Sequence, residues 1–287
     1  MGKSIGFIGQ GMIGASYADD FEERGLPVVR YDNERYKKNR KEIASCGIVF
    51  IAVPAPTTPQ GFDSSILEEV LKLVADDGIA IIKSTMLPGT TYRLQKMYPK
   101  LRLMHSPEFL RGMRNPKEDA RQPDRNILGY TDQSKEDTDE VFSIMSPAPY
   151  QKATPALTAE LIKYMGNTYL VQKVLLANLM YDLSEKLGID YNEVRDAVGA
   201  DPRIGYNHLD IDDLGGRGAA GHCFIKDLAA LSRFYNEMLP EDELGTSLLK
   251  AMEKKNIHLM RSTNKDIDLL EGVYGAINIG DDPHSVS

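Results

Sequence analysis

The chain has 287 residues, of which 42% are hydrophobic and 26% charged, as in an ordinary globular protein, and this length is sufficient for two domains. Its formal net charge of −8 argues against affinity for the phosphate backbone of nucleic acids. No apolar run is long enough to cross a bilayer, so we expect neither nucleic acid nor a membrane as a partner.

The chain contains only two cysteines, Cys46 and Cys223. Two cysteines make neither a disulfide framework nor a metal-site spacing, and the five histidines show no metal-ligand pattern, so no metal is expected. The first residues lead directly into an apolar strand pattern, without the layout of a signal peptide. These features predict a cytoplasmic protein.

In the first half of the chain, short apolar runs alternate with amphipathic stretches. The apolar runs predict strands at residues 3–9, 27–32, 47–53, 78–83, 101–105 and 125–130. Helices are expected at residues 13–24, 64–75, 90–98 and 134–145. Alternation of helices with almost wholly apolar strands is typical of a parallel sheet covered on both faces. Residues 1–152 are therefore predicted to form an α/β domain, a Rossmann doubly wound parallel sheet.

The pattern changes after Thr154. An apolar stripe continues without a break from Leu157 to Leu187, and Pro155 and Gly188 are suitable residues for the start and the end of one long helix. Further helices are expected at residues 191–198, 226–236 and 244–260. Residues 153–287 are thus predicted to form an all-helical domain with a long central helix. Its apolar residues lie on more than one face and need a second partner surface, so a homodimer is expected.

A glycine-rich turn follows the first predicted strand. Gly9, Gly11 and Gly14 form a G-x-G-x-x-G pattern that opens a helix, and the next predicted strand ends at Asp32. The glycines permit a tight turn, close approach of a pyrophosphate and helix–strand packing, and Asp32 accepts hydrogen bonds from a ribose. A carboxylate repels a 2′-phosphate, so NAD is favoured over NADP, although Arg35 lies close by in the sequence. The predicted cofactor-binding residues are Gly9, Gly11, Met12, Ile13, Gly14, Asp32, Val53, Pro54, Ser84 and Thr85.

Five further segments carry residues suited to chemistry: residues 83–90 (KSTMLPGT), 105–112 (HSPEFLRG), 159–167 (AELIKYMGN), 201–205 (DPRIG) and 221–227 (GHCFIKD). Together, and in this order, they resemble the UDP-glucose/GDP-mannose dehydrogenase family over about residues 3–260. The resemblance implies an NAD-dependent nucleotide-sugar dehydrogenase that oxidises the C6 alcohol of a sugar to a carboxylate in two hydride transfers. The second transfer passes through a cysteine thiohemiacetal and a thioester, which water hydrolyses.

The residue types in these segments suit such a reaction. Cys223 is a strong nucleophile where a cation or a helix N-terminus lowers its pKa, and Lys226 and a helix start after Phe224 would supply both. Lys163 and Asn167 lie four residues apart on the predicted long helix, on one face, where they can polarise a carbonyl or stabilise an alkoxide. Glu108 follows the fifth strand and can act as a general base for water.

The resemblance extends these roles to neighbouring residues. It implies that Thr85 and Asp227 hold the hydrolytic water or relay its proton, and that Lys226 also contacts the cofactor. It places Phe109 and Leu110 beside Glu108 at the substrate, and Arg203 as the residue that reaches the sugar of a neighbouring subunit. A dimer formed through the long helix is implied as well.

The chain departs from the family pattern at three places. His222 and Ile225 replace a serine and a proline beside the cysteine, and Gly112-Met113 stands where many relatives carry a second glutamate. The typical family chain also continues into a second Rossmann-like domain that holds the nucleotide, whereas this sequence stops after the expected linking helix. Weaker binding, a smaller substrate, a partner that supplies the missing part, or lost activity are all consistent with this difference.

Two other functions fit the same residues. A β-hydroxyacid-type dehydrogenase makes a single hydride transfer and shares the arrangement of one Rossmann domain, one helical domain and a Lys-x-x-x-Asn pair, but it needs no cysteine. A non-catalytic NAD-binding protein would have an unreactive Cys223.

Overall fold

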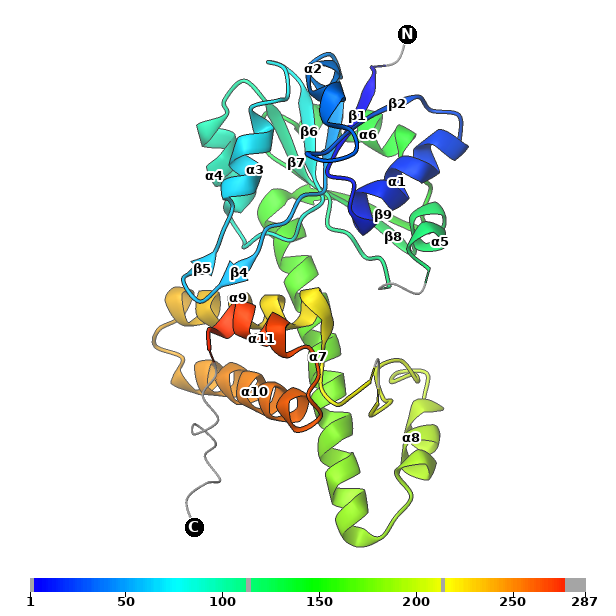
Figure 1. Ribbon diagram of the computed structural model, residues 1–287, viewed down its shortest axis with the longest axis vertical. Helices are drawn as coiled ribbons and strands as arrows, with labels where there is room; N and C mark the ends of the chain where they lie inside the picture. The colour runs from blue at the N-terminus through cyan, green and yellow to red at the C-terminus, as the bar shows by residue number, and fades with distance from the viewer. Residues whose placement is uncertain (1–2, 112–114, 213–214, 277–287) are drawn as a thin grey trace. The chain divides into compact units, whose positions relative to one another are not determined.

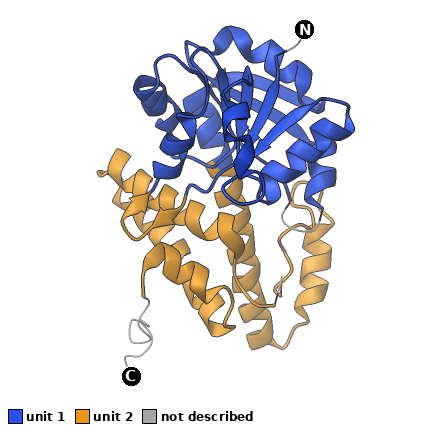
Figure 2. Ribbon diagram, turned by 45° about the horizontal axis from the view of Figure 1, so that its top comes forward, with its two compact units in different colours: residues 1–55, 63–163 blue, residues 56–62, 164–287 orange. Residues whose placement is uncertain are grey.

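The computed structural model describes residues 3–111, 115–212 and 215–276. The chain folds into two compact units, the first formed by residues 1–55 and 63–163 and the second by residues 56–62 and 164–287 (Figure 2). The domain boundary expected between residues 152 and 153 stays a prediction, because compactness does not show where an independently folding domain ends.

A seven-stranded sheet forms the centre of the first unit (Figure 1). Its order is β2 (Val28–Tyr31), β1 (Ile5–Ile8), β3 (Ile48–Ile51), β6 (Ile79–Ile82), β7 (Arg102–His105), β8 (Arg125–Tyr130) and β9 (Tyr150–Pro155). All neighbouring strands are parallel except β7 and β8, which are antiparallel. The predicted α/β class and doubly wound sheet are therefore confirmed, and β9 is a strand that the sequence pattern did not predict.

The strands β1, β3 and β6 are buried along their whole length, as their continuous apolar sequence requires. Three aromatic rings, those of Phe7, Phe21 and Phe50, fill the core on one side of the sheet with centroids 5.0–5.3 Å apart. Phe21 belongs to α1 (Met12–Glu23), which joins β1 to β2 and packs its apolar face on this core. The core therefore fixes α1, and with it the glycine-rich turn that precedes this helix.

Helix α1 has twelve residues, as the sequence predicted, whereas α3 (Ser65–Leu71) and α4 (Thr90–Met97) are shorter than predicted. Helices α2 (Arg40–Ile43) and α5 (Pro116–Arg121) were not among the expected helices, and α6 is formed by Thr138–Ile144. The stretch expected as one helix at 134–145 divides into a 3₁₀ turn, η2 (Lys135–Asp137), and α6; another 3₁₀ turn, η1 (Lys37–Asn39), precedes α2.

The long helix α7 (Ala156–Leu187) is continuous over 32 residues, as predicted. Its first turns belong to the first unit, where buried Glu160 accepts hydrogen bonds from Gly89 N (2.6 Å), Thr91 N (2.8 Å) and the hydroxyl of Thr91 (2.6 Å). This carboxylate satisfies amides at the start of α4, which has no cap from its own side chains. The start of α7 is thereby anchored beside β6 and α4.

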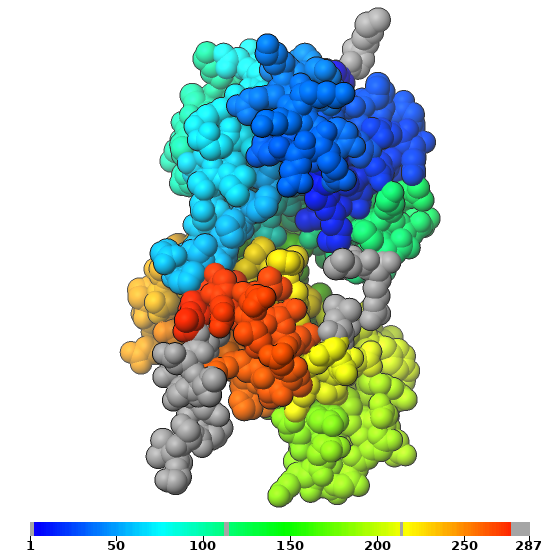
Figure 3. All heavy atoms as spheres, in the orientation of Figure 1, coloured from blue at the N-terminus to red at the C-terminus, as the bar shows by residue number. Residues whose placement is uncertain are grey.

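The second unit is helical apart from one small hairpin. It contains the remainder of α7, α8 (Tyr191–Gly199), α9 (Gly221–Met238), α10 (Glu243–Ser262), α11 (Ile267–Tyr274), and the two-residue strands β4 (Thr57–Thr58) and β5 (Gly61–Phe62). Apolar residues of α7, α9 and α10 form one core. Leu270 and Val273 of α11 pack on α9 in a second core, and the outer side of α11 is seen at the surface in Figure 3. No helix within the described residues has the length and apolarity to cross a membrane.

The start of α9 corrects one sequence prediction. The helix begins at Gly221 and not after Phe224, so Cys223 lies inside its first turn. Ile225 is 1% exposed and packs with Ala229 and Met260 in the second core. A branched apolar side chain at this position therefore serves packing. His222, the other substituted residue, is exposed to solvent.

Candidate functional site

The glycine-rich turn after β1 has the backbone that its sequence predicts. Gly9 has a φ of +88°, and a Cβ there would lie 2.3 Å from the carbonyl oxygen of Ala52. A Cβ on Gly14 would lie 1.9 Å from the carbonyl oxygen of Gly9. A Cβ on Gly11, in contrast, would meet no protein atom within 4 Å. Packing within the chain therefore demands glycine at two of the three positions, whereas at Gly11 the side that a ligand would approach is open.

The first turn of α1 suits an anion. Gly11 is the N-cap of α1 and supplies no side-chain acceptor, and the first turn contains no acidic residue. The amide groups of a first helical turn and the helix dipole together attract a phosphate. These residues fit the pyrophosphate of a dinucleotide cofactor, held by the backbone from Gly11 to Gly14 with the side chains of Met12 and Ile13 beside it.

This difference between the glycines gives a test. Gly14→Ala is expected to destabilise the fold by several kcal/mol, on the scale of about 3 kcal/mol for overpacking, and to abolish cofactor binding as well. Gly11→Ala is the matched variant: it should change unfolding free energy by less than about 1 kcal/mol but weaken NAD about tenfold or more. Thermal unfolding and calorimetric titration with NAD measure the two effects. Unchanged NAD affinity in Gly11→Ala would show that the pyrophosphate lies elsewhere.

Asp32 lies directly after β2, and one of its oxygens is used by the chain itself. Its Oδ1 accepts hydrogen bonds from Glu34 N (3.0 Å) and Tyr36 N (2.9 Å). Its Oδ2 is 3.9 Å from Nε of Arg35, whose Nη2 donates to the carbonyl oxygen of Gln10 at 2.7 Å. The carboxylate is thus fixed with Oδ2 turned to Arg35, in the position expected of the ribose acceptor.

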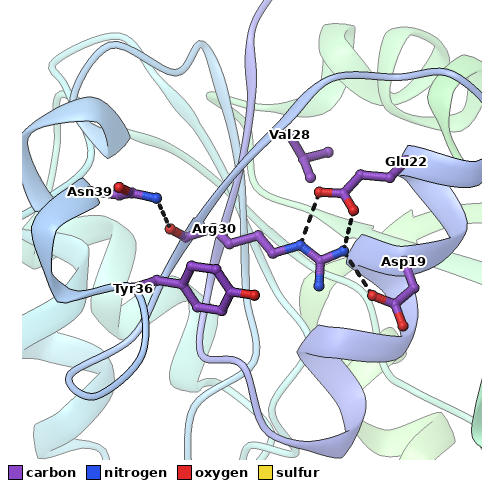
Figure 4. Close-up of a pocket in the computed structure, with 6 residues that line it drawn as sticks. All are labelled: Asp19, Glu22, Val28, Arg30, Tyr36 and Asn39. Atoms are coloured by element: carbon purple, nitrogen blue, oxygen red, sulfur yellow. Dashed lines mark hydrogen bonds and ion pairs between the residues drawn. The ribbon is translucent and has the colours of Figure 1, made fainter.

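A cavity of about 380 Å³ beside β2 is lined by Asp19, Glu22, Val28, Arg30, Tyr36 and Asn39 (Figure 4). Its one arginine, Arg30, is 2.8 Å from Asp19 and 2.6 Å from Glu22, so two carboxylates neutralise its charge. An arginine that binds a 2′-phosphate must be free to pair with it. This cavity therefore offers no phosphate site, which agrees with a preference for NAD.

The other strand ends bring further predicted residues to the same edge of the sheet. Ser84 donates its hydroxyl hydrogen to the carbonyl oxygen of Val53 at 2.6 Å, which joins the ends of β6 and β3. Thr85 is buried and Pro54 exposed. These residues follow the carboxyl ends of parallel strands, which form the edge that lines the ligand crevice in such sheets.

A buried ion pair follows β7. Lys163 Nζ donates to the carbonyl oxygen of Glu108 at 2.7 Å and to Oε1 of the same residue at 3.1 Å, and the two side chains are 5% and 6% exposed. The backbone N–H of Leu110 donates to Glu108 Oε2 at 2.8 Å. The Phe109 ring centroid lies 5.6 Å from Lys163 Nζ and 4.0 Å from Cζ of Arg125. A buried carboxylate and ammonium in direct contact can exchange a proton with a bound substrate.

The second unit holds a separate group of predicted residues. Asn167 Nδ2 donates to Asp227 Oδ2 at 2.6 Å, and Lys226 Nζ lies 2.5 Å from Asp227 Oδ1. Asp227 is fully buried and lies four residues after Cys223 on α9, so the two residues share one face of the helix. The first turn of α9 favours a negative charge such as a thiolate, although Asp266 already accepts a hydrogen bond from Gly221 N at 2.8 Å.

Arg203 lies at the surface of the second unit. Its side chain is 87% exposed and pairs with Asp201, two residues earlier, at 2.6 Å. Residues 112–114, which include the predicted departure at Gly112-Met113, are outside the described residues.

Sequence reasoning missed two buried residues beside the Glu108 and Lys163 pair, namely Lys83 and His105. Lys83 is 2% exposed, with Nζ 3.2 Å from Ser106 Oγ, and burial lowers its pKa to about 7. His105 is fully buried, and burial lowers its pKa to about 3, so its ring is neutral at pH 7. The sequence signal was a lysine and a histidine at the ends of two buried strands. Within the described residues no group of His, Cys, Asp and Glu side chains has the arrangement of a metal site.

Two domains of one protein family match the chain. Residues 35–146 match the NAD binding domain of the UDP-glucose/GDP-mannose dehydrogenase family, and residues 157–258 match the central domain of the same family. The first match begins after the glycine-rich turn, so the assignment of that turn as a dinucleotide-binding turn rests on its own sequence and geometry. NAD is therefore the cofactor that the first unit is built to bind.

Individual relatives agree with these matches. UDP-glucose 6-dehydrogenase of Rickettsia prowazekii is 32% identical over 255 residues, which are 83% of this chain and 56% of that protein. UDP-glucose 6-dehydrogenase of Haloferax volcanii is 30% identical over 280 residues, covering 79% of this chain and 64% of that protein. The structure of a UDP-glucose dehydrogenase from Pyrobaculum islandicum has a TM-score of 0.76 at 27% identity and covers 97% of this chain and 72% of that one. The chain thus spans between about half and two thirds of the length of these curated relatives.

Proposed function

Because this chain belongs to the UDP-glucose/GDP-mannose dehydrogenase family, we propose that it is an NAD-dependent nucleotide-sugar 6-dehydrogenase that makes two successive hydride transfers. The observation that carries the proposal is the buried contact between Glu108 and Lys163 after β7. A single oxidation of an alcohol needs no general base for a hydrolytic water, whereas a reaction that ends in a carboxylic acid needs one.

In the first oxidation, a primary alcohol becomes an aldehyde, and bound NAD supplies the hydride acceptor. Lys163 and Asn167, one turn apart on α7, stabilise the negative charge that develops on the alcohol oxygen. Asp227 supports this role because it fixes the amide of Asn167 through a 2.6 Å hydrogen bond.

In the second oxidation, the thiolate of Cys223 adds to the aldehyde carbon and forms a thiohemiacetal. The thiohemiacetal then loses its hydroxyl proton and transfers a second hydride to a further NAD molecule, which gives a thioester. Attack of water on the thioester releases the carboxylate and restores the thiol. Glu108 takes the proton of this water, and Thr85 and Asp227 hold the water or relay the proton. Lys226, beside Asp227, adds a positive charge on the helix that carries the thiol.

The substrate that this chemistry requires is a UDP- or GDP-sugar with a free C6 alcohol. Phe109 and Leu110 flank Glu108 at the sugar, and the exposed Arg203 is free to turn from Asp201 to the sugar of a neighbouring subunit. A uronic acid product would serve polysaccharide biosynthesis, and a cytoplasmic site of action stays a prediction.

The direct test is the number of NADH molecules formed for each sugar oxidised, measured by absorbance across a panel of UDP- and GDP-sugars. A ratio of two supports the proposal. A ratio of one would favour a single-hydride, β-hydroxyacid-type reaction. NAD binding without turnover of any sugar in the panel would instead indicate a non-catalytic cofactor-binding protein.

We also propose a homodimer formed through α7. Large apolar side chains of this helix are exposed in the single chain: Leu157, Leu161, Met165, Tyr169, Leu176, Leu179, Met180, Leu183 and Leu187. With the exposed Gln172 between Tyr169 and Leu176, they follow one another along one face of the helix at intervals of three or four residues, as in helices that bury one face against a partner.

Leu176→Glu should shift the protein from a dimer to a monomer, since it would bury a carboxylate in an apolar interface at a cost of several kcal/mol, about 3 or more. Leu176 is 57% exposed in the single chain, so the monomer itself should stay folded. Light scattering coupled to size exclusion gives the mass. Leu248→Glu, at a leucine that is 61% exposed on α10, is the control for added charge. A monomeric unmodified chain, or a Leu176→Glu dimer, would contradict an interface through this stripe.

A further inference from the structure

Lys83 is a fully buried lysine in the first unit, at the end of β6. Its Nζ lies 3.2 Å from Ser106 Oγ, 3.5 Å from the carbonyl oxygen of Ser106 and 3.9 Å from the centroid of the Tyr17 ring. The side chain is 2% exposed. Taking an ammonium group out of water destabilises a fold unless its surroundings compensate for the lost hydration. Apolar residues would serve packing at lower cost.

The contacts of Lys83 join three segments that the proposed reaction uses. Tyr17 belongs to α1, whose first turn is the expected pyrophosphate site. Ser106 precedes Glu108 by two residues in the turn after β7. Lys83 itself directly precedes Ser84 and Thr85. The Lys83 side chain therefore contacts α1 through Tyr17, and it contacts the turn that carries Glu108 through Ser106.

Titratable groups on α1, on β7, in the turn after β7 and on α7 surround Lys83. Glu108 and Lys163 both act on it electrostatically: burial lowers its pKa to about 7, Glu108 opposes this shift, and Lys163 adds to it. His105, on β7, is neutral at pH 7 and fully buried, and its Nε2 has no hydrogen-bond partner. Burial, then Glu108, Asp20 and Asp119, raise the pKa of Tyr17, so its ring is also neutral.

We propose that Lys83 is a positioning residue, whose ammonium fixes the Ser106–Glu108 turn and whose charge controls the Glu108–Lys163 pair electrostatically. Lys83, Lys163 and Glu108 carry a net charge of +1 when both lysines are protonated, and 0 when Lys83 loses its proton. When Lys83 is protonated, its positive charge attracts the Glu108 carboxylate and repels the Lys163 ammonium. In the neutral state the Lys163–Glu108 ion pair stands alone. Near pH 7 the cluster changes between these states.

The activity test rests on the proposed function. The kcat/KM for the best nucleotide sugar is measured from about pH 5.5 to 9.5 for the unmodified chain, Lys83→Met and Lys83→Arg. The unmodified chain should show an inflection near pH 7, which Lys83→Met lacks. Lys83→Arg stays charged at all these pH values and should also lack it. Both substitutions should lower kcat more than they raise KM. The exposed Lys96→Met should keep the original profile. An inflection near pH 7 in Lys83→Met would overturn the proposal.

A second test needs no activity. The folded chain releases the Lys83 proton near pH 7, whereas the unfolded chain holds it up to the ordinary value of 10.5, so unfolding takes up a proton between these values. The stability of the unmodified chain therefore rises across this window, and the Tm advantage of Lys83→Met over it should shrink as pH rises.

Coupling to Glu108 is read from the same experiment in a Glu108→Gln background. Glu108 raises the pKa of Lys83, so its removal should move the pH dependence of the Tm difference to lower pH. A Tm difference that is flat with pH, or one that Glu108→Gln leaves in place, would overturn the proposal. A chain that turns over no sugar but shows both stability effects would contradict the proposed function and still support the electrostatic role of Lys83.

Discussion

Cys223→Ser should form acid at least about a thousandfold more slowly than the unmodified chain, and should release no more than one NADH for each sugar that reacts. A serine hydroxyl is almost wholly protonated at neutral pH and is a far weaker nucleophile than a thiolate, whereas the first hydride transfer does not use the thiol. Rapid-mixing absorbance measurements of NADH, with product analysis for aldehyde and acid, separate the two steps. Two NADH per sugar in this variant would exclude Cys223 as the nucleophile.

The other cysteine provides the matched control. Cys46 is 1% exposed, and burial raises the pKa of its thiol. Cys46→Ala should keep the ratio of two NADH per sugar. Alkylation should modify Cys223 before Cys46, because a buried neutral thiol reacts slowly. Equal alkylation rates would show that neither thiol is activated and would favour the non-catalytic alternative.

The sequence predicted the residues of the candidate site better than their contacts. Lys163 and Asn167, four residues apart, were expected to act from one face of a helix. In the structure Lys163 pairs with Glu108, 55 residues away, and Asn167 with Asp227, 60 residues away. Helical spacing predicts which side chains share a face, but partners so distant in sequence follow from tertiary packing. Helical periodicity could predict only that Lys163 and Asn167 lie on one face of α7.

The missed elements have local physical causes. The strand β9 lies at the edge of the sheet and is mostly exposed, so it lacks the apolar run by which buried strands were recognised. The hairpin of β4 and β5 has only two residues in each strand. The first turn of α9 begins with Gly221 at a φ of +79°, a residue and a conformation that normally interrupt helices. Lys83 was counted as the end of a strand, because no pattern in one sequence shows that a lysine is buried.

The last prediction concerns the buried pair itself. Lys163→Met would leave the carboxylate of Glu108, which is 6% exposed, without the ammonium that contacts it. Removing one partner of a buried ion pair costs about 3–5 kcal/mol, since the remaining charge stays desolvated. Glu108→Gln should cost less, because the loss of the Glu108 charge lowers the pKa of Lys83 further and that lysine can then be neutral at pH 7. Denaturant unfolding at pH 7 measures both changes.

The double variant Lys163→Met with Glu108→Gln decides between a role in stability and a role in chemistry. Removing both charges takes away the uncompensated carboxylate, so the double variant should be more stable than Lys163→Met alone, and the two costs should not add. Turnover should stay at least about a thousandfold below that of the unmodified chain in all three variants, because neither the oxyanion cation nor the general base is restored. Additive stability effects would show that the two residues are not energetically coupled. Recovered turnover in the double variant would show that the pair supports the fold and takes no part in the reaction.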